Sequence, residues 1–311
     1  MSDSSRFAKL RQRAELLHRM RAFFHDRGFL EVETPLVSEE VIPELHIEPL
    51  QLANGQFLQA SPELHMKRLL AEGAKAIFQV THSFRAGERG KLHNPEFTMV
   101  EWYRVGDDMD AGIAFIDALM QTLLHTPSAK RTSYADAFRE HAGLDPFAAT
   151  LDELAAIEPA PAGFDGANRD EWLNLILAKR VEPQLGRNET EILCHYPASQ
   201  AALAKTMRSA NGYEVAERFE LYYRGIELAN GYHELADAAE QRRRFEQVNA
   251  ERLADGRPAL PIPESLLAAL ERGFPDCTGV ALGFDRLVML AIDAETIDEI
   301  LTFPAGRAMI S

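Results

Sequence analysis

The sequence predicts an α+β fold in which helices pack on a mainly antiparallel sheet. Segments with strand character follow one another directly, as "AIFQVTHSF" at 76–84 and "EFTMVEWYRV" at 96–105 do. Consecutive strands of this kind favour an antiparallel sheet. Helical segments do not separate the strands regularly, which disfavours a doubly wound parallel fold. The sequence also contains neither G-x-x-x-x-G-K-[ST] nor G-x-G-x-x-G, the phosphate-binding motifs of such folds.

The composition bounds the classes of function. The chain has 311 residues and a net charge of -15, which argues against a broad nucleic-acid surface but leaves room for a small basic pocket. No apolar run approaches the length of a membrane span, and the N-terminus lacks the apolar region of a secretory signal. Cys194 and Cys277 are far apart, so we interpret them as buried, reduced thiols of a cytoplasmic protein.

The N-terminal part predicts a helix, a strand and a second strand–helix unit. Apolar side chains recur near helical spacing over 6–27, and Gly28 is expected to end that helix. "FLEVETP" alternates like a strand and ends at Pro35. In "FLQASPELHMKRLL" a strand precedes a helix, for which Ser61 is the expected N-cap and Pro62 the first helical residue.

The strands at 76–84 and 96–105 frame a short basic loop, "RAGERGKLHNP", in an otherwise acidic chain. By period-two alternation, four side chains of the second strand share one face: Phe97, Met99, Glu101 and Tyr103. Such a face suits a ligand with a flat part and a cationic part. The other interpretation is that the aromatic rings belong to the core and the carboxylate is exposed.

The rest of the chain alternates helices, strands and one loop-rich region. We expect helices over 109–125 and 133–142, a loop-rich excursion over 143–168, a helix over 169–181, a strand in "TEILCHYP", several strands in "YEVAERFELYYRGIELANGYHEL", a charged helix ending at Gly256, a strand in "GVALGF" and a final helix in "DRLVMLAID".

In "GIELANGYHEL", Glu227 and Glu234 are separated by an odd number of positions, so a regular strand would place them on opposite faces. A bulge at Asn230-Gly231 would turn both carboxylates toward one site, where they could hold Mg²⁺ beside a phosphate. The other interpretation is a surface hairpin with an Asn-Gly turn. Both remain open on these residues alone.

"GVALGFDRLVML" places a charged residue in an apolar helix. Gly283 allows close approach of the backbone before the helix. Arg286 lies in the first turn and, if buried, needs an anionic partner. Either Asp285 or a ligand phosphate could be that partner.

Taken in order, these stretches resemble the three motifs of class II aminoacyl-tRNA synthetases. Motif 1 is the helix and strand before Pro35, motif 2 is F-R-(loop)-H-N-P-E-F-T-M-x-E-W-Y, and motif 3 is G-x-x-x-G-x-D-R, preceded by E-L-A-N-G-x-x-E. "HNPEFTM.E.Y" and "NG..EL.DA..Q..RF" are similar to the lysyl branch. The resemblance covers nearly the whole chain and implies one catalytic domain over 1–311, with an antiparallel sheet flanked by helices.

The resemblance also implies a reaction, in which an amino-acid carboxylate attacks the α-phosphorus of ATP with Mg²⁺ present. The catalytic residues would be Arg85, Glu227, Glu234 and Arg286, the two glutamates also binding the metal. ATP would be held by Arg85, Ala86, Gly87, Glu88, His93, Asn94, Phe97, Glu227, Leu228, Gly283 and Arg286. The amino-acid pocket would be lined by Ser61, Pro62, Glu63, Glu101, Tyr103, Asn230, Tyr232, Glu234 and Ala281. Three carboxylates there fit a substrate with two ammonium groups.

Three departures from the lysyl pattern bear on the substrate. Ala281 stands where lysyl-tRNA synthetases usually carry Gly, and its methyl group would narrow the floor of the amino-acid pocket. F-R-A-G replaces F-R-N-E, so either Glu88 or a backbone carbonyl would contact the adenine. The tRNA-reading domain that precedes the lysyl core is expected to be absent.

A free-standing lysyl-type core with "SPELHMKRLL", "YPASQAALA" and "GVALGFDRLVML" is similar to the ligases of elongation factor P. That family transfers (R)-β-lysine to one lysine of its protein substrate, which is shaped like a tRNA. The resemblance implies elongation factor P as partner, a homodimer formed through motif 1, and no tRNA substrate. Two other hypotheses are a truncated synthetase that acylates tRNA or another carrier, and a non-catalytic regulatory paralogue.

Overall fold

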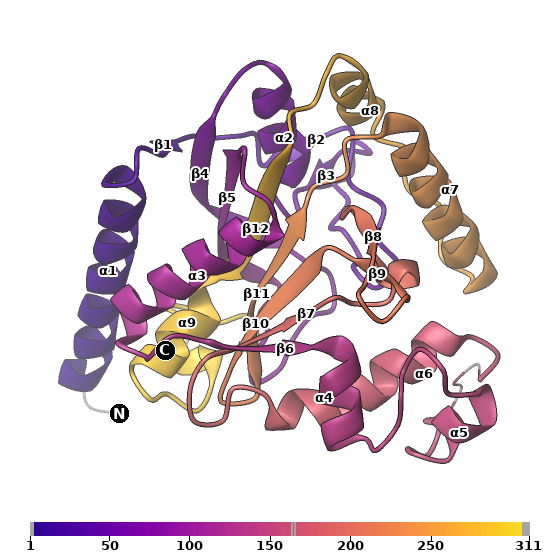
Figure 1. Cartoon of the computed structure of the whole chain (residues 1–311). Helices are drawn as coiled ribbons and strands as arrows, with labels where there is room; N and C mark the ends of the chain where they lie inside the picture. Colours follow the sequence, from indigo (N-terminus) through magenta and orange to yellow (C-terminus); the bar gives the residue numbers. More distant parts are fainter. Residues whose placement is uncertain (1–2, 163, 165, 307–311) are drawn as a thin grey trace. The chain divides into compact units, whose positions relative to one another are not determined.

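The computed structural model describes residues 3–162, 164 and 166–306 (Figure 1). Its contacts divide the chain into two compact units. The first unit contains the described residues up to Asp107 and from Leu235 onward, and the second is Asp108–Glu234. The interpretation of the whole chain as one catalytic domain stays a prediction.

The first unit is built on four strands in the order β1-β4-β5-β12, and these confirm the predicted hairpin. Their bounds are Leu30–Glu31 for β1, Ala76–Phe84 for β4, Glu96–Val105 for β5 and Cys277–Gly283 for β12. β4 pairs antiparallel with β5, and β5 with β12. β1 is parallel to β4 and has only two residues, so the strand predicted for "FLEVETP" is largely irregular.

Five helices belong to the described part of this unit: α1 (Asp3–His25), α2 (Glu63–Ala71), α7 (Ala238–Ala254), α8 (Glu264–Glu271) and α9 (Phe284–Ala291). A small ladder of β2 (Val37–Ser38) and β3 (Phe57–Leu58) completes it, with a 3-10 turn at Ile297–Glu299. α8 and β2 were not predicted from the sequence. β2 has only two residues, and the two turns of α8 carry little periodicity.

One face of these strands is the core and the other carries polar groups. Phe24 of α1 stacks on Phe78 of β4 at 4.5 Å between ring centroids and lies 5.3 Å from the ring of Trp102 on β5. Figure 1 shows α1 running beside β1 and β4. Side chains alternate along a strand, so Glu101 and Tyr103, which flank Trp102 in the sequence, point to the opposite face from Trp102. The packing of α1 therefore leaves that face for a site.

The second unit has its own strands, in the order β11-β10-β7-β6. They are β6 (Lys130–Ser133), β7 (Glu191–Cys194), β10 (Arg218–Tyr223) and β11 (Ile226–His233), and β6 alone runs parallel to its neighbour. The other elements are α3 (Met109–Leu124), α4 (Tyr134–His141), α5 (Leu151–Ala155), α6 (Arg169–Ile176), a π-helical turn at Leu177–Val181, 3-10 turns at Glu182–Gln184 and Ala198–Gln200, and the ladder β8 (Thr206–Arg208)/β9 (Glu214–Ala216). β6 and β8 were not predicted from the sequence.

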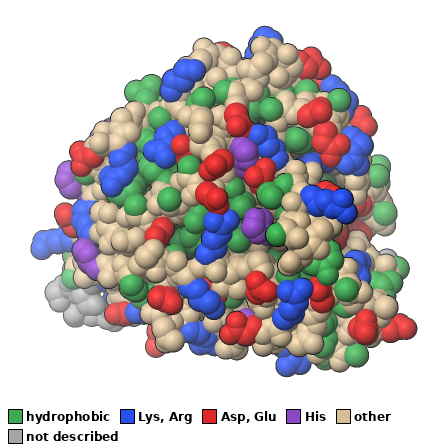
Figure 2. Space-filling view, viewed as in Figure 1, with side chains coloured by type: hydrophobic (Ala, Val, Ile, Leu, Met, Phe, Trp, Pro, Cys, Tyr) green, Lys and Arg blue, Asp and Glu red, His purple; other side chains and the backbone are tan. Residues whose placement is uncertain are grey.

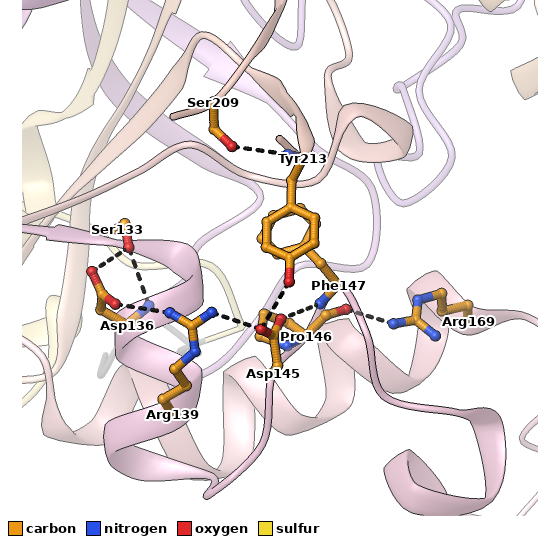
Figure 3. Close-up of polar contacts among 9 residues, drawn as sticks. All are labelled: Ser133, Asp136, Arg139, Asp145, Pro146, Phe147, Arg169, Ser209 and Tyr213. Carbon is orange, nitrogen blue, oxygen red and sulfur yellow. Dashed lines mark hydrogen bonds and ion pairs between the residues drawn. The ribbon is translucent and has the colours of Figure 1, made fainter. Parts of the chain in front are cut away.

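The excursion over 143–168 is more ordered than its composition predicts. It contains α5, which begins with a capping box between Thr150 and Glu153. Asp145 accepts hydrogen bonds from Arg139 at 2.6 Å and from the hydroxyl of Tyr213 at 3.1 Å (Figure 3). The ring of Phe147 stacks on that of Tyr213, with centroids 4.5 Å apart. These contacts fasten the start of the excursion to the second unit.

The surface agrees with the acidic composition. On the face shown in Figure 2, Lys and Arg side chains are scattered among Asp and Glu, and no broad basic area is visible. In the part of the chain that the structure describes, no helix combines the length and the apolar character needed to cross a membrane.

Candidate active site

The polar face of β5 gathers a buried carboxylate and two hydroxyl groups. Ser61 donates to Oε2 of Glu101 at 2.6 Å, and Tyr103 donates to Oε1 of the same carboxylate at 2.6 Å. The Glu101 side chain is almost completely buried, at 2% exposure. The interpretation of an exposed carboxylate between core aromatics is therefore wrong, while the predicted common face of Glu101 and Tyr103 is confirmed.

Ser61 and Pro62 differ slightly from their predicted roles. The helix α2 begins at Glu63, so Pro62 is the N-cap and Ser61 precedes it. The Ser61 hydroxyl still accepts the N–H of Glu63 at 3.0 Å, as a capping side chain does two residues ahead of the bonded N–H. One hydroxyl thus ties the start of α2 to the carboxylate of β5.

Burial and a second carboxylate raise the pKa of Glu101. Burial is the larger cause and the nearby carboxylate of Glu63 the next, and together they raise this pKa to about 8 against the opposing hydrogen bonds from Ser61 and Tyr103. Glu63 is itself paired with Lys67, at 2.5 Å between Nζ and Oε1, and Lys67 is only 2% exposed. Lys67 was not among the predicted site residues, although its i,i+4 spacing from Glu63 in the predicted helix was a usable signal.

Ala281 lies directly beside this carboxylate. In the β5/β12 ladder it is the cross-strand partner of Glu101. Cross-strand partners project on the same side of a sheet, at about 5 Å between Cβ atoms. Ala281 is partly exposed while its neighbours Val280 and Leu282 are buried. A methyl group therefore borders the open space next to Glu101.

The basic loop between β4 and β5 holds Arg85 over an aromatic ring. The Arg85 guanidinium carbon lies 5.1 Å from the centroid of Phe97, and Nη1 lies 3.9 Å from the carboxylate of Glu88. Nε of Arg85 is buried and makes no hydrogen bond to any part of the chain that the structure describes. Such an orphaned donor fits an anionic ligand such as a phosphate.

The remaining loop residues are held by the backbone. Gly87 has φ +76°, a conformation that favours glycine. The Asn94 amide donates to the carbonyl of Glu96 at 2.6 Å and accepts the N–H of Ala305 at 2.9 Å. Asn94 therefore fastens the loop, and its role in binding a nucleotide stays a prediction. Arg89 pairs with Asp298 at 2.8 Å.

Arg286 meets the loop through a histidine. Its Nη2 lies 2.7 Å from Nε2 of His93, and burial, together with the positive charge of Arg286, lowers the pKa of His93. A neutral His93 can accept this hydrogen bond. Asp285 is not the partner of Arg286, because its carboxylate pairs with Arg13 of α1 at 2.6 Å and accepts the N–H of Thr98 at 2.9 Å. Arg13 was not predicted as this partner, since nothing in the sequence links α1 to α9.

In the second unit, the course of β11 decides between a bulge and an Asn-Gly turn in the stretch from Glu227 to Glu234. The strand continues through Asn230 and Gly231, so the interpretation of an Asn-Gly turn is wrong. The hairpin turns at Arg224-Gly225 instead, where both residues have positive φ. A register shift opposite Leu221 and Tyr222 leaves Leu228 as an extra residue in β11. The bulge is therefore real but lies at Leu228.

The bulge restores a common face. Tyr222 pairs with Glu227, Glu220 with Asn230, and Arg218 with Tyr232, so alternate residues of β10 face Glu227, Asn230 and Tyr232 on one side. Glu234 follows Tyr232 by two positions and is 1% exposed. Gly231 faces the other side, where a Cβ would lie 2.4 Å from the ring of Phe219. Glycine is needed here for packing.

This face of the second unit also carries an orphaned acceptor. The amide nitrogen of Asn230 donates to the Tyr232 hydroxyl at 2.8 Å. The buried Oδ1 of Asn230 accepts no hydrogen bond from the described residues. A ligand ammonium group would supply one. No cluster of three or more metal-binding side chains occurs in the part of the chain that the structure describes. Glu227 and Glu234 offer two carboxylates, and a phosphate-bound Mg²⁺ needs only one or two.

The comparison with protein families bears on these residues as a set. The family "tRNA synthetases class II (D, K and N)" matches residues 1–307. The chain belongs to this family.

Curated relatives show which members of the class II family this chain is similar to. A protein of Edwardsiella ictaluri named elongation factor P--(R)-beta-lysine ligase is 48% identical, over 98% of this chain and 97% of its own. Proteins with the same name from Klebsiella pneumoniae and Salmonella gallinarum are 46% and 45% identical over the same shares. The predicted resemblance and the predicted α+β class II core are thereby confirmed.

The three class II motifs lie in the first unit, and the E-L-A-N-G-x-x-E stretch lies in the second. The first unit brings together the hairpin residues Arg85, Glu88, His93, Phe97 and Arg286, and separately Ser61, Glu63, Glu101, Tyr103 and Ala281. The second unit aligns Glu227, Asn230 and Tyr232 on one face, and the buried Glu234 follows just after the end of β11. The first group offers guanidinium groups and an aromatic face, and the others offer carboxylates. Such donors suit a phosphorylated aromatic ligand and a cationic ligand.

Proposed function

We propose that this protein is an ATP-dependent ligase that activates (R)-β-lysine and transfers it to the ε-amine of a lysine on elongation factor P. The observation that carries the proposal is the buried pair Glu63 and Glu101, bordered by Ala281, in a chain that is 45–48% identical to ligases of that name over nearly its full length. Buried carboxylates fit ammonium groups, and a methyl group in place of hydrogen favours an isomer other than α-lysine.

In the first step the substrate carboxylate attacks the α-phosphorus of ATP, and pyrophosphate leaves. The carboxylate is already ionised at neutral pH, so no general base is required. Catalysis then consists of positioning and of stabilising charge. Arg85, with its orphaned Nε, would hold the α-phosphate. Phe97 and Arg286 would flank the adenine, with Arg286 kept in place by His93.

Other residues would hold the nucleotide through their backbone or through a metal ion. Ala86, Gly87 and Glu88 would contact the adenine, and Leu228 and Gly283 would let the nucleotide approach the backbone. Glu227 and Glu234 would be the protein ligands of Mg²⁺, which supplies positive charge to the phosphates when bound.

In the second step the ε-amine of the acceptor lysine attacks the carbonyl carbon of the adenylate. An amide bond forms, the bond to the phosphate oxygen breaks, AMP leaves and the amine loses a proton. Ordinary aminoacylation would instead use a tRNA hydroxyl as nucleophile. The net charge of -15 and the scattered basic residues favour a protein acceptor over tRNA. We place the reaction in the cytoplasm, where neither buried cysteine needs to form a disulfide.

The test is an ATP–pyrophosphate exchange assay across amino acids, followed by transfer with separate acceptors. We expect exchange with (R)-β-lysine above all other amino acids. No exchange with any amino acid would favour the regulatory paralogue. Transfer to tRNA in preference to elongation factor P would favour the truncated synthetase.

Replacing Ala281 by Gly tests the choice of amino acid. We expect Ala281→Gly to raise kcat/KM on α-lysine relative to (R)-β-lysine, because one methyl group beside Glu101 is worth about 1–3 kcal/mol, or roughly 10–200-fold. The measurement is kcat/KM for both isomers with both enzymes. Val280→Ala is a matched control, since it removes methyl groups one position away on the buried face. An unchanged isomer ratio in Ala281→Gly would show that this methyl group does not discriminate.

We also propose a homodimer formed through motif 1. The edge strand β1 and the segment that follows expose Leu30, Leu36 and Val37 by 63%, 42% and 39%. An exposed apolar sheet edge of this kind is typical of an interface. We expect light scattering to give the mass of a dimer, and Leu30→Arg to shift it toward monomer. Leu253→Arg, at 61% exposure on α7, is the matched control and should leave the mass unchanged. A wild-type monomer at micromolar concentration would contradict the proposal.

A further inference from the structure

The helix α7 turns an unusually polar side toward the interior of the first unit. Its buried residues are Gln241, Phe245, Asn249 and Arg252. Arg252 has no exposed surface at all and is among the largest fully buried side chains of the described chain. A buried guanidinium is costly unless its donors are satisfied, and apolar residues of similar size often stabilise a fold as well or better. Simple packing therefore gives a weak reason for an arginine here.

The contacts of Arg252 converge on one irregular segment, residues 44–48, between β2 and β3. Nη1 donates to the carbonyl of Glu44 at 3.1 Å and lies 3.5 Å from that of Ile47, and Nη2 pairs with the carboxylate of Glu48 at 2.9 Å. Nε donates to the carbonyl of Pro258 at 3.1 Å. A single guanidinium thus fixes both ends of a segment that has no regular secondary structure to hold it.

The same segment receives the start of the basic loop. The N–H of Ala86 donates to the carbonyl of Glu48 at 2.8 Å, while the N–H of Arg85 donates to Pro95 at 2.9 Å. Glu48 therefore contacts Arg252 through its carboxylate and the residue after Arg85 through its carbonyl. This is a direct chain of contacts from a buried side chain of α7 to the backbone that carries the phosphate-binding guanidinium.

We propose that Arg252 is a positioning residue for Arg85: by clamping residues 44–48 it sets the place of the Glu48 carbonyl, and through Ala86 it sets where the basic loop leaves β4. The inference rests on the proposed role of Arg85 in binding ATP. A guanidinium suits this task because its rigid fork can satisfy several carbonyls at once, whereas a lysine ammonium is a single point charge. Misplacing the loop would affect ATP far more than the amino acid.

Two variants test the proposal in pyrophosphate exchange, with KM measured separately for ATP and for (R)-β-lysine. We expect Arg252→Lys to lower kcat/KM for ATP by roughly 10- to 100-fold, the effect of misplacing a reacting group by about 1 Å, with the KM for the amino acid nearly unchanged. Glu48→Ala should also impair the use of ATP, by raising the KM for ATP. Arg243→Lys makes the same chemical change on an exposed, 62% accessible position of α7 and should have no effect.

The outcomes separate positioning from stability. A purely structural role would reduce the amount of folded enzyme and leave both KM values at the wild-type level, and that result would overturn the proposal. If Arg252→Lys does not fold, Glu48→Ala decides, because the Glu48 side chain is 44% exposed and its loss leaves no cavity. If the wild-type protein shows no exchange, the proposed function fails; equilibrium binding of ATP to the same variants then still tests the positioning, and equal affinities would contradict it.

Discussion

Arg85→Ala is expected to lose about 10²–10³-fold in the rate of adenylate formation without unfolding the protein, the typical cost of removing one preorganised group from a developing charge. The structure supports a ligand-directed role. The guanidinium is partly buried, its Nε lacks a hydrogen-bond partner in the described chain, and its ion pair with Glu88 is long, at 3.9 Å. Removing it therefore breaks few contacts within the protein.

The measurement is pyrophosphate exchange beside a thermal unfolding curve. Lys91→Ala is the matched control, since it removes another basic side chain of the same loop that is exposed and outside the proposed site. It should keep its activity. Exchange by Arg85→Ala at close to the wild-type rate would show that the phosphate is bound elsewhere.

Glu101→Gln is expected to weaken binding of the amino acid by about 2–5 kcal/mol, the usual cost of removing one partner of a buried charge pair. In the protein without substrate, the pKa of Glu101 is raised to about 8, chiefly by burial, so the group is largely protonated at neutral pH. A cationic substrate favours the ionised form. Binding should therefore release a proton, and the KM for the amino acid should fall as pH rises toward 8.

The raised pKa of Glu101 also makes the stability of the fold depend on pH. The pKa of Glu101 in the folded protein lies above its ordinary value of 4.5, so the folded state holds the proton between about pH 4.5 and 8. The free energy of unfolding should therefore fall as pH rises through that window. Below pH 8, the KM for the amino acid should fall by at most about tenfold for each unit by which the pH rises.

Measuring that KM from pH 6 to 8 at saturating ATP tests the assignment. Glu101→Gln should remove the slope. Glu96→Gln, on the exposed end of the same strand, should retain it. A slope that survives in Glu101→Gln would place the titrating group elsewhere.

Local pattern was enough to predict much of the fold. The strands at 76–84 and 96–105 match β4 and β5 residue for residue, because alternation and a short loop are properties of neighbouring residues. The helix predicted over 109–125 corresponds to α3, which ends at Leu124. The shared face of Glu101 and Tyr103 followed from the same alternation.

The errors arose where partners distant in sequence decide the structure. The position of the bulge at Leu228 depends on the pairing of β11 with β10. Gly231 is required by close packing against the ring of Phe219, not by a turn. Asp285 is taken by Arg13 from the N-terminal helix. Burial of Glu101 depends on α2 and β12 together, and no alternation pattern predicts how deeply a carboxylate is covered.

The most direct test of the account is transfer of (R)-β-lysine to elongation factor P by the wild-type protein with ATP, followed by intact-mass spectrometry of the acceptor. We predict the addition of a single lysyl group to one lysine, dependent on ATP and much faster than with α-lysine. An acceptor of unchanged mass under conditions in which the protein exchanges pyrophosphate, or equal modification by both isomers, would contradict the central claim.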